Sequence, residues 1–299
     1  MNIVAHSREN RSAIIVMCVG VLLLVINDAV AKGLVTRFDP FQILFARSLV
    51  ALPFVAAWAM RSGSGLAELC SAKPSVHVLR AALAVAATYL FIASLDILSL
   101  AEATALIFTA PILVAALSWP LLGQRVGGAR LAAVGIGFLG ALIAVRPGTD
   151  MMQPASLLAL GAALVNALVM MSARWIDPRD SFWTMTFYMT LLSGLLCIFT
   201  LAMDWPSIRA DDIGLFMLMA AAGTMGIALI SHAFRVGDAA AVAPFDYTAL
   251  IWATVIGWAV WGSVPGWPVY LGAVVIAAGG IVLILLDARG KKQQQKSGA

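Results

Sequence analysis

Charged residues are scarce in this sequence of 299 residues, of which Asp, Glu, Lys and Arg together make up only 11%. A soluble globular domain carries about 25% charged residues and about 45–50% apolar ones. Here 62% of the residues are apolar, and the mean hydropathy is +0.96. The composition therefore excludes a soluble globular protein, a disordered chain, collagen and a coiled coil.

Cysteine and histidine are also few, with three residues of each. Cys18, Cys70 and Cys197 lie far apart without the spacing of metal ligands, so they predict neither a metal site nor structural disulfides. His77 and His232 are too isolated to suggest a metal site, and we predict no metal and no cofactor. The basic residues behind the net charge of +4 lie singly between apolar runs, which argues against a nucleic-acid partner.

The sequence does contain a series of long apolar runs bounded by charged residues, Gly or Pro. A membrane-spanning helix takes about 20 apolar residues, and ten runs are of this kind. We therefore predict an all-α membrane protein of ten transmembrane helices, embedded in a lipid bilayer and without a soluble domain. The predicted spans are 12–31, 41–60, 76–96, 102–122, 127–145, 155–174, 182–203, 213–234, 239–261 and 266–287.

Lys and Arg are distributed unequally between the two sides that these spans define. Of the 19 Lys and Arg residues, Arg47 lies inside a span, and only Lys32, Arg37, Arg146 and Arg209 lie on the side opposite the termini. The remaining 14 lie on the side of both termini. Because Lys and Arg are retained on the cytoplasmic side of a membrane, we predict that both termini are cytoplasmic.

The two halves of the chain resemble each other when the sequence is shifted by 139 residues. Trp119 then falls on Trp258, and Asn27 falls on Asn166. Each half, 1–148 and 149–299, contains five predicted spans, and because five is odd the second half enters the membrane from the opposite side. We therefore predict two inverted five-helix repeats, an architecture typical of secondary transporters with a substrate site near the midplane of the membrane.

Corresponding spans that are interrupted by Pro or Gly point to the site of such a transporter. The fourth span contains Pro111, and the ninth contains Pro244. A proline inside a span removes a backbone hydrogen bond and frees a carbonyl group. We interpret both prolines as helix hinges beside the site, with a kink that has no ligand role as the alternative.

Amide, hydroxyl, indole and carboxyl groups in several spans are candidates for binding the substrate. Such groups offer hydrogen bonds to a neutral or zwitterionic solute, and hydrogen bonds between packed helices are the alternative. A carboxylate deep in a span could meet a substrate ammonium group or bind a proton. The candidate substrate-binding residues are Asn27, Tyr89, Asn166, Tyr188, Asp246, Tyr247, Thr248 and Trp252.

Three further ionisable residues lie on the side of the membrane that is predicted to face outward. Arg47 in the second span is placed to reach Asp28 in the first, and Glu102 begins the fourth span on the same side. Ionisable groups inside a membrane are costly and are functional by default. A structural ion pair and a part in substrate or proton coupling are the two alternatives for this group.

The sequence resembles the EamA family of the drug/metabolite transporter superfamily over nearly its whole length. The likeness is carried by the ten spans in two repeats and by the segments 121–125, 243–248 and 261–265. The resemblance implies a bacterial inner-membrane transporter, monomeric or weakly dimeric, similar to YddG-type exporters of aromatic and other neutral amino acids. Gln124 and Ser263 stand where members of the family commonly have Glu, so the resemblance does not imply coupling to protons. We expect at most a weak dependence on protons, because the candidate site residues are mainly neutral and Asp246 is the only lone carboxylate deep in a span.

We therefore predict a protein that exports small neutral or zwitterionic metabolites, above all amino acids, by alternating access. Transport of a vitamin, a polyamine or a drug is the alternative within the same class. Phosphate-bearing solutes are disfavoured, because Arg47 is the only basic residue well inside a span. A membrane enzyme would need a clustered catalytic set, and a channel would need rings of carbonyls or like charges. Neither pattern is visible in the sequence, so we predict that the protein is not an enzyme.

Overall fold

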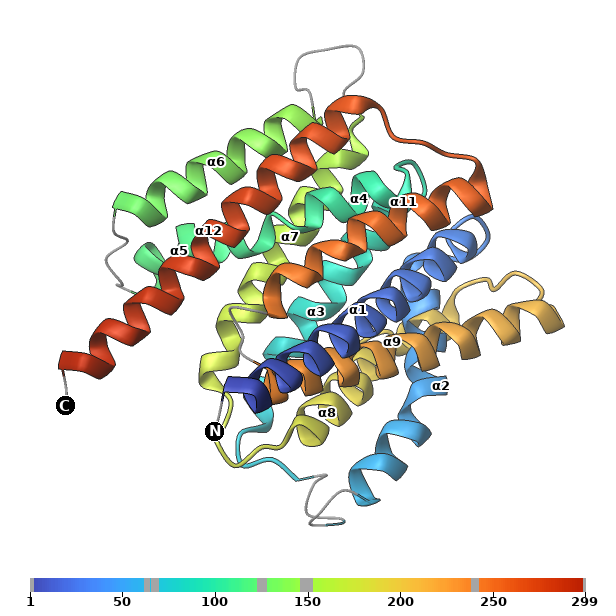
Figure 1. The fold of residues 1–299 in the computed structure, drawn as a ribbon. Helices are drawn as coiled ribbons and strands as arrows, with labels where there is room; N and C mark the ends of the chain where they lie inside the picture. The colour runs from blue at the N-terminus through green and yellow to red at the C-terminus, as the bar shows by residue number, and fades with distance from the viewer. Residues whose placement is uncertain are drawn as a thin grey trace.

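The computed structural model describes residues 3–61, 65, 70–122, 128–145, 153–237 and 242–297, and within these ranges it contains helices and no strand (Figure 1). The α-helices are α1 (Ile3–Leu34), α2 (Pro40–Arg61), α3 (Pro74–Leu95), α4 (Leu100–Ile107), α5 (Ala110–Leu122), α6 (Gly128–Val145), α7 (Ala155–Ser172), α8 (Phe182–Leu196), α9 (Ala210–Val236), α11 (Thr248–Trp261) and α12 (Trp267–Ser297). Short 3₁₀ helices are η2 (Ala173–Trp175), η3 (Ile198–Ala202) and η4 (Ala243–Tyr247). The predicted all-α class is confirmed for this part of the chain.

Seven segments of the described chain are long and apolar enough to cross a membrane, with mean hydropathies between 1.6 and 2.6. They are Ser12–Leu34, Pro40–Trp58, Pro74–Leu95, Leu100–Leu117, Ala155–Trp175, Phe182–Ala202 and Ala210–Val236. Gly135–Ala144 in α6 and Trp267–Val282 in α12 are shorter apolar segments. These lengths and compositions are those of a multi-pass membrane protein, while the number of ten spans stays a prediction.

Several helices begin or end at residues that suit the position. Pro74 lies in the first turn of α3, where the missing N–H group costs no hydrogen bond. α4 begins with a capping box, in which Ser99 Oγ accepts from the Glu102 N–H and Glu102 Oε2 accepts from the Ser99 N–H. α11 ends at Gly262, whose φ of +64° lies in the left-handed region that favours glycine. Local sequence therefore determines these ends.

The fourth and ninth predicted spans are each interrupted close to their proline. α4 ends at Ile107, and Pro111 is the second residue of α5. In the ninth span Pro244 lies in η4, and α11 follows directly from Thr248. Proline fits the first turn of a helix but not its interior. The two prolines therefore account for the positions of the two breaks, and their role as hinges stays a prediction.

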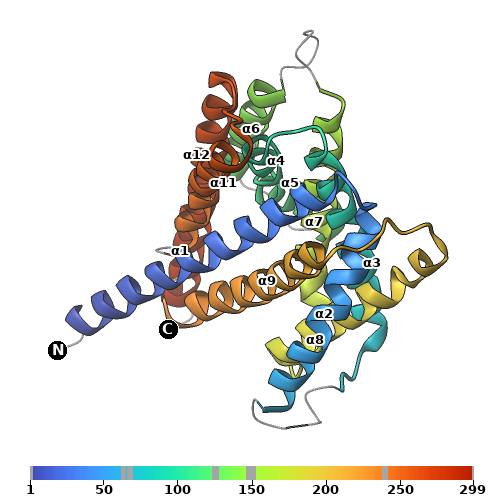
Figure 2. The ribbon, with the colours of Figure 1, turned by 90° about the vertical axis from the view of Figure 1, so that its right-hand side faces the viewer.

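Helices from the first half of the chain pack against helices from the second half throughout the bundle. α1 packs against α9, α3 against α7, α2 against α8, and α6 against α12. Figure 1 shows α6 and α12 running side by side, and Figure 2 shows α1 running alongside α9. No half forms a separate body in this arrangement, because each of these four contacts joins the two halves.

Glycine allows two of these contacts to be very close. A Cβ atom added to Gly140 of α6 would lie 2.8 Å from the carbonyl oxygen of Gly272 in α12. In the contact of α1 with α9, a Cβ atom on Gly226 would lie 2.9 Å from the carbonyl oxygen of Gly20. Small residues let membrane helices approach until their backbones touch, so a larger side chain at these positions would separate the halves.

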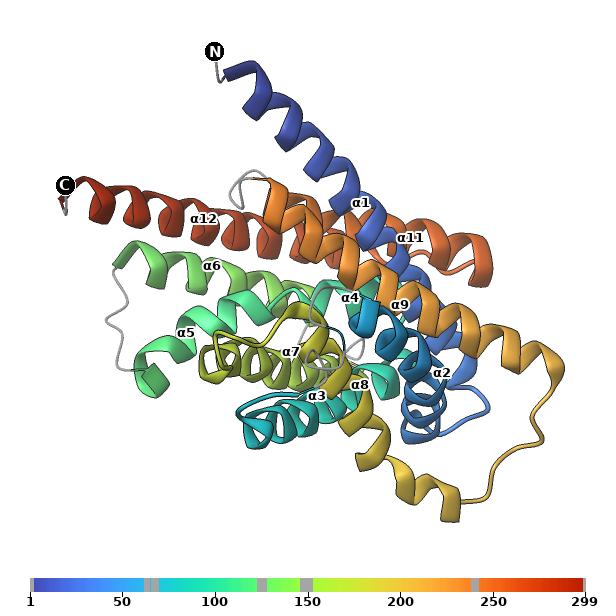
Figure 3. The same ribbon diagram turned by 90° about the horizontal axis from the view of Figure 1, so that it is seen from below.

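The beginning of α1 and the end of α12 lie at the same end of the bundle in all three views (Figures 1, 2 and 3). The most continuous apolar core surrounds the middle and the end of α1, where Met17, Val21 and Ile43 are almost completely buried. An even number of crossings would bring both chain ends to one side of a membrane. The assignment of that side to the cytoplasm stays a prediction.

Candidate functional site

A cavity of about 360 Å³ lies between α2, α3, α8 and α9, so both halves of the chain form its wall. Pockets for small molecules have volumes of about 300–1,000 Å³, and this cavity therefore has room for a small organic solute. Its lining residues are Leu44, Arg47, Ser48, Ala51, Arg80, Ala84, Thr88, Phe182, Met185, Thr186, Met189, Thr190, Ser193, Thr224 and Ile227.

Hydroxyl groups form a polar stripe along the α8 side of this cavity. Thr186, Thr190 and Ser193 follow one another at intervals of four and three residues, which places them on one face of the helix. Thr186 Oγ1 donates to the Phe182 carbonyl at 2.8 Å, and Thr190 Oγ1 donates to the Thr186 carbonyl at 2.9 Å. Because these hydroxyl hydrogens are used inside the helix, the oxygens remain as acceptors for a solute. This stripe was not predicted from the sequence, although its helical spacing within an apolar run is visible there.

Arg80 of α3 lines the cavity but is already bonded to α7. Its Nη1 atom donates to the Val169 carbonyl at 2.9 Å and to Ser172 Oγ at 3.0 Å. A cation at the end of a helix also interacts favourably with the negative end of the helix dipole. Arg80 therefore stabilises the C-terminal end of α7, and this contact was not foreseen from the sequence.

Arg47 of α2 lines the cavity and reaches the contact between α1 and α9. A Cβ atom added to Gly223 of α9 would lie 2.9 Å from Arg47 Nη2 and 2.8 Å from Asn27 Oδ1 of α1. Asn27 Nδ2 donates to Asp28 Oδ1 at 2.9 Å. Asn27 and Arg47 thus approach the same point above Gly223, and Asp28, which the sequence placed within reach of Arg47, is bonded to Asn27.

None of the eight candidate substrate-binding residues, all of which the structure describes, lines this cavity. Tyr89 stacks on Phe41 with a centroid distance of 4.2 Å, and Tyr188 stacks on His77 at 4.6 Å. Asn166 is half-buried in α7. Asn27 adjoins the cavity through Arg47, as described above. These residues therefore lie in several separate places, and their role in binding stays a prediction.

The candidates at the beginning of the ninth span lie beside a different feature. Tyr247 packs on Phe108 at 4.8 Å and lines an apolar groove of about 450 Å³ between α4, α11 and α12. Thr248 Oγ1 donates to the Phe245 carbonyl of its own segment at 2.6 Å. Asp246 is half-buried next to Tyr247. The Trp252 Nε1 atom is buried without a hydrogen-bond partner in the described part of the chain. The groove itself offers a solute little polar surface.

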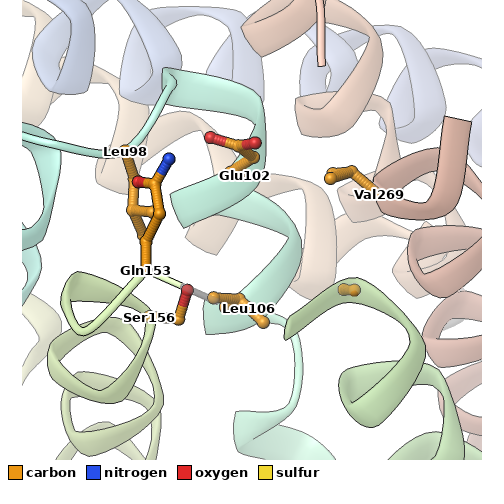
Figure 4. Close-up of a pocket in the computed structure, with 7 residues that line it drawn as sticks. Leu98, Glu102, Leu106, Gln153, Ser156 and Val269 are labelled. Atoms are coloured by element: carbon orange, nitrogen blue, oxygen red, sulfur yellow. The ribbon is translucent and has the colours of Figure 1, made fainter. Parts of the chain in front are cut away.

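Glu102 lines a small pocket (Figure 4), and Arg47 is not among the residues that line it. The pocket has a volume of about 40 Å³, and Figure 4 shows Gln153 and Ser156 beside Glu102 at its edge. This volume holds a few water molecules and no organic solute. One carboxylate oxygen of Glu102 already caps α4 through Ser99, so the residue has a structural role whatever else it does.

An ion pair joins the two halves of the chain just before α2, on the N-terminal side of the α2 residues that line the cavity. Arg37 Nη1, in the turn between α1 and α2, lies 2.6 Å from Asp212 Oδ1 in the first turn of α9. Close by, Gln42 Nε2 donates to the Asp204 carbonyl at 3.1 Å, two residues before Leu44 enters the cavity wall. We call the Arg37–Asp212 pair the outer tie, after the side of the membrane on which the sequence predicts it.

A second polar contact joins the halves near the opposite end of the cavity. His77 Nε2 of α3 lies 2.9 Å from Asp180 Oδ2, and Ser71 Oγ donates to the same oxygen at 2.8 Å. His77 is fully buried, although the sequence made it look isolated, because Asp180 comes from the other half of the chain. A catalytic triad would place the carboxylate on Nδ1, and here Nδ1 has no partner in the described residues. We call the His77–Asp180 contact the inner tie.

Comparisons with known proteins agree with this architecture. The model of the EamA-like transporter family matches the chain twice, over residues 11–146 and 153–286. An S-adenosylmethionine uptake transporter of Rickettsia prowazekii is 25% identical over 91% of this chain and 92% of its own length. A riboflavin transporter of Vibrio cholerae is 32% identical over 67% of this chain and 68% of its own length. A crystal structure with 19% sequence identity matches the fold with a TM-score of 0.61, covering 93% of this chain and 98% of the other.

Proposed function

The chain belongs to the EamA-like transporter family, and on this premise we propose that it moves a small neutral or zwitterionic metabolite, such as an amino acid, across the membrane by alternating access. The observation that carries the proposal is the cavity of about 360 Å³, which both halves of the chain enclose. A site between two halves opens to one side or the other when the halves rock against each other. Members of this family are transporters and not enzymes, as the sequence predicted.

The proposal includes two inverted repeats, 1–148 and 149–299. The family matches once within each of these ranges, at 11–146 and at 153–286. The helix packing also supports a two-fold relation. Exchanging the halves converts the α1–α9 contact into the α7–α3 contact and leaves the α2–α8 and α6–α12 contacts unchanged. Rocking of one repeat against the other would therefore open the cavity to either side of the membrane through equivalent helix contacts.

The two ties are the proposed gates. In the outer tie, Arg37 lies between α1 and the part of α2 that lines the cavity. In the inner tie, His77 lies three residues before Arg80, and Asp180 lies two residues before Phe182. Arg80 and Phe182 line the other end of the cavity. Each tie joins one half of the chain to the other, so neither end can widen while its tie is made. Alternating access requires the two ties to break in turn.

The choice of substrate follows from the cavity and from the relatives. The cavity combines Arg47 with hydroxyl acceptors and apolar side chains such as Met185 and Met189, which suits a solute with polar and apolar parts. Two relatives are named for S-adenosylmethionine and riboflavin. S-adenosylmethionine shares its carboxylate and ammonium groups with amino acids, while riboflavin lacks both. We place amino acids first and include the two other solutes in the test.

The setting of the proposal is a bacterial inner membrane, with both termini cytoplasmic and with export as the direction. Relatives from Rickettsia and Vibrio support a bacterial membrane. The name of the Rickettsia protein refers to uptake, so the direction has to be measured and not transferred. Protein inserted in one known orientation, with solute supplied to either side, separates export from uptake.

Counterflow in proteoliposomes tests the proposal. Vesicles are loaded with an unlabelled solute, and the transient uptake of the same labelled solute is followed for amino acids, S-adenosylmethionine and riboflavin. A transporter produces an overshoot above equilibrium, whereas a channel produces none and an enzyme converts the solute. We expect an overshoot with at least one amino acid. Vesicles that behave like protein-free liposomes with all of these solutes would disprove the proposal.

A further inference from the structure

Arg47 and Arg80 both line the cavity, but their surroundings differ. The lining contains two arginines, and Arg80 donates to two acceptors on α7. Arg47, the eighth of the 22 residues of α2, lies beside Asn27 and Gly223 at the contact of three helices. A guanidinium group inside a membrane is retained when it meets an acidic group or serves a function. Asp28 supplies the nearby negative charge, because it is tied to Asn27 by a hydrogen bond of 2.9 Å.

The surroundings of Arg47 fix where its guanidinium lies. Asn27 donates its amide N–H to Asp28, and this bond turns Asn27 Oδ1 toward the space above Gly223. That oxygen is buried and has no hydrogen-bond partner within the described residues, and Asn27 as a whole is only 7% exposed. Oδ1 and Arg47 Nη2 both lie within 3 Å of the point that a Cβ atom on Gly223 would occupy, at 2.8 and 2.9 Å. The absence of a side chain at position 223 therefore lets the guanidinium sit between α1 and α9.

The rest of the cavity wall completes a site for a carboxylate. Guanidinium groups bind carboxylates with two parallel hydrogen bonds, which adds geometric selectivity to the charge. Ser48 follows Arg47 directly, and Ser193 and Thr224 line the same cavity from α8 and α9. α2 and α8 approach closely at this level, since a Cβ atom on Gly194 would lie 3.2 Å from Ser48 Cβ. Further along α8, the oxygens of Thr186 and Thr190 can only accept, which suits the ammonium end of a zwitterion.

We propose that Arg47 binds the carboxylate of the transported solute, with Gly223 as the positioning residue that leaves room for its guanidinium at the cavity wall. The inference rests on the proposed transport function and narrows its substrates to carboxylate-bearing solutes, with the carboxylate beside the first half of α2. Asp28 balances the charge of Arg47 when the cavity is empty. Solutes of the same size without a carboxylate bind more weakly because they cannot form the charge-assisted hydrogen bonds that a carboxylate makes with the guanidinium.

Three probes of similar size test the proposal on the purified protein. L-phenylalanine carries both charges, L-phenylalaninamide lacks the carboxylate, and 3-phenylpropionate lacks the ammonium group. Apparent affinities come from the ligand-dependent shift of the unfolding temperature, which requires no transport. We expect the parent protein to bind both carboxylates about tenfold to a hundredfold more tightly than the amide, the usual range for a charge-assisted hydrogen bond.

The variants assign this preference to Arg47. Arg47→Gln should abolish the preference for the carboxylate, whereas Arg80→Gln, in the same cavity, should retain it. Gly223→Ala keeps Arg47 in the chain but displaces its guanidinium, so it should weaken carboxylate binding and leave binding of the amide nearly unchanged. A parent protein that binds L-phenylalanine and its amide equally would overturn the proposal, as would an Arg47→Gln variant that keeps the preference.

The outcomes separate this inference from the proposed function. Counterflow of any solute without a preference for carboxylates would leave transport standing and remove the carboxylate site. If Arg80→Gln abolished the preference and Arg47→Gln kept it, the carboxylate would bind at Arg80, and the proposal would be contradicted. If the protein neither binds nor exchanges any of the solutes tested, both proposals fail together.

Discussion

Arg37 Nη1 lies 2.6 Å from Asp212 Oδ1, across a separation of 175 residues in sequence. The side chain of Asp212 is only 5% exposed, and its second oxygen accepts the Arg209 N–H at 2.8 Å. Arg37 also donates to the Ser207 carbonyl at 3.1 Å. The outer tie thus fixes the turn between α1 and α2 to the beginning of α9, and it closes one end of the contact between the halves.

Breaking the outer tie should open that end of the cavity. Arg37→Gln removes the charge that balances the buried Asp212, so we expect unfolding to become easier by about 1–3 kcal/mol. We also expect faster modification of a cysteine in the cavity by an impermeant thiol reagent added from the side of Arg37. Arg179→Gln is the matched control, because Arg179 is an exposed arginine in an ion pair at the other end. Equal rates in the two variants would show that the pair is no gate.

Breaking the inner tie should open the other end of the cavity. Asp180→Ala leaves His77 Nε2 and Ser71 Oγ without their shared acceptor, and because His77 is fully buried we expect a loss of about 2–3 kcal/mol. Cysteine modification should become faster from the side of His77. Asp177→Asn, which weakens the ion pair with the exposed Arg179, should destabilise the protein less than Asp180→Ala and leave the rate of cysteine modification close to that of the parent. Unchanged thermal unfolding of the Asp180→Ala variant would contradict this role.

The breaks at the two prolines should matter for transport more than for folding. Pro111→Ala and Pro244→Ala permit a more continuous helix, so the protein should remain folded while the bending needed for alternating access is restricted. We expect slower initial rates of counterflow at matched protein levels. Pro53→Ala is the control, since Pro53 lies inside α2, away from both breaks. If both variants transport at the parental rate, these prolines are packing features and no hinges.

The topology can be tested with single cysteines in a variant that lacks Cys18, Cys70 and Cys197. Thr149→Cys lies in the loop predicted to face outward, outside the described residues, and Ser297→Cys lies at the end of α12. An impermeant thiol reagent on intact cells should label the first and spare the second. Labelling of the Ser297→Cys variant would place the C-terminus outside and overturn the predicted orientation.

The sequence predicted the helices well because a membrane span is set by a local property. The third span was expected at 76–96, and α3 covers Pro74–Leu95. In the seventh span, expected at 182–203, α8 ends at Leu196 and the short helix η3 follows from Ile198 to Ala202. The family resemblance is also confirmed, since its motifs are local segments. Apolar length and helix-breaking residues are readable without any knowledge of the fold.

The candidate site was harder to predict because depth in the membrane does not determine which way a side chain faces. Trp252 and Thr254 lie two residues apart, yet Trp252 packs on the core around α1 and Thr254 lines the apolar groove beside α12. The cavity brings Arg47 near Thr190, 143 residues later, through the packing of α2 on α8. Only tertiary contacts decide such encounters. Asp28 could be predicted as a partner of Arg47 because neighbouring spans at one depth leave few partners for a charge, whereas the approach of Arg47 to Asn27 and Gly223 was not predicted.

The cavity between α2 and α8 is the central element of the proposed mechanism, and blocking it is the most direct test. Ser193→Cys places a thiol in the cavity, and Thr254→Cys places one in the apolar groove beside α11, where the sequence had favoured a site. Both variants, made without the native cysteines, are treated with a bulky thiol reagent before counterflow is measured. We expect modification of Ser193→Cys to abolish the overshoot and modification of Thr254→Cys to preserve it. Full counterflow after complete modification of Ser193→Cys, with loss in Thr254→Cys, would move the site to the groove between α4, α11 and α12 and contradict this account.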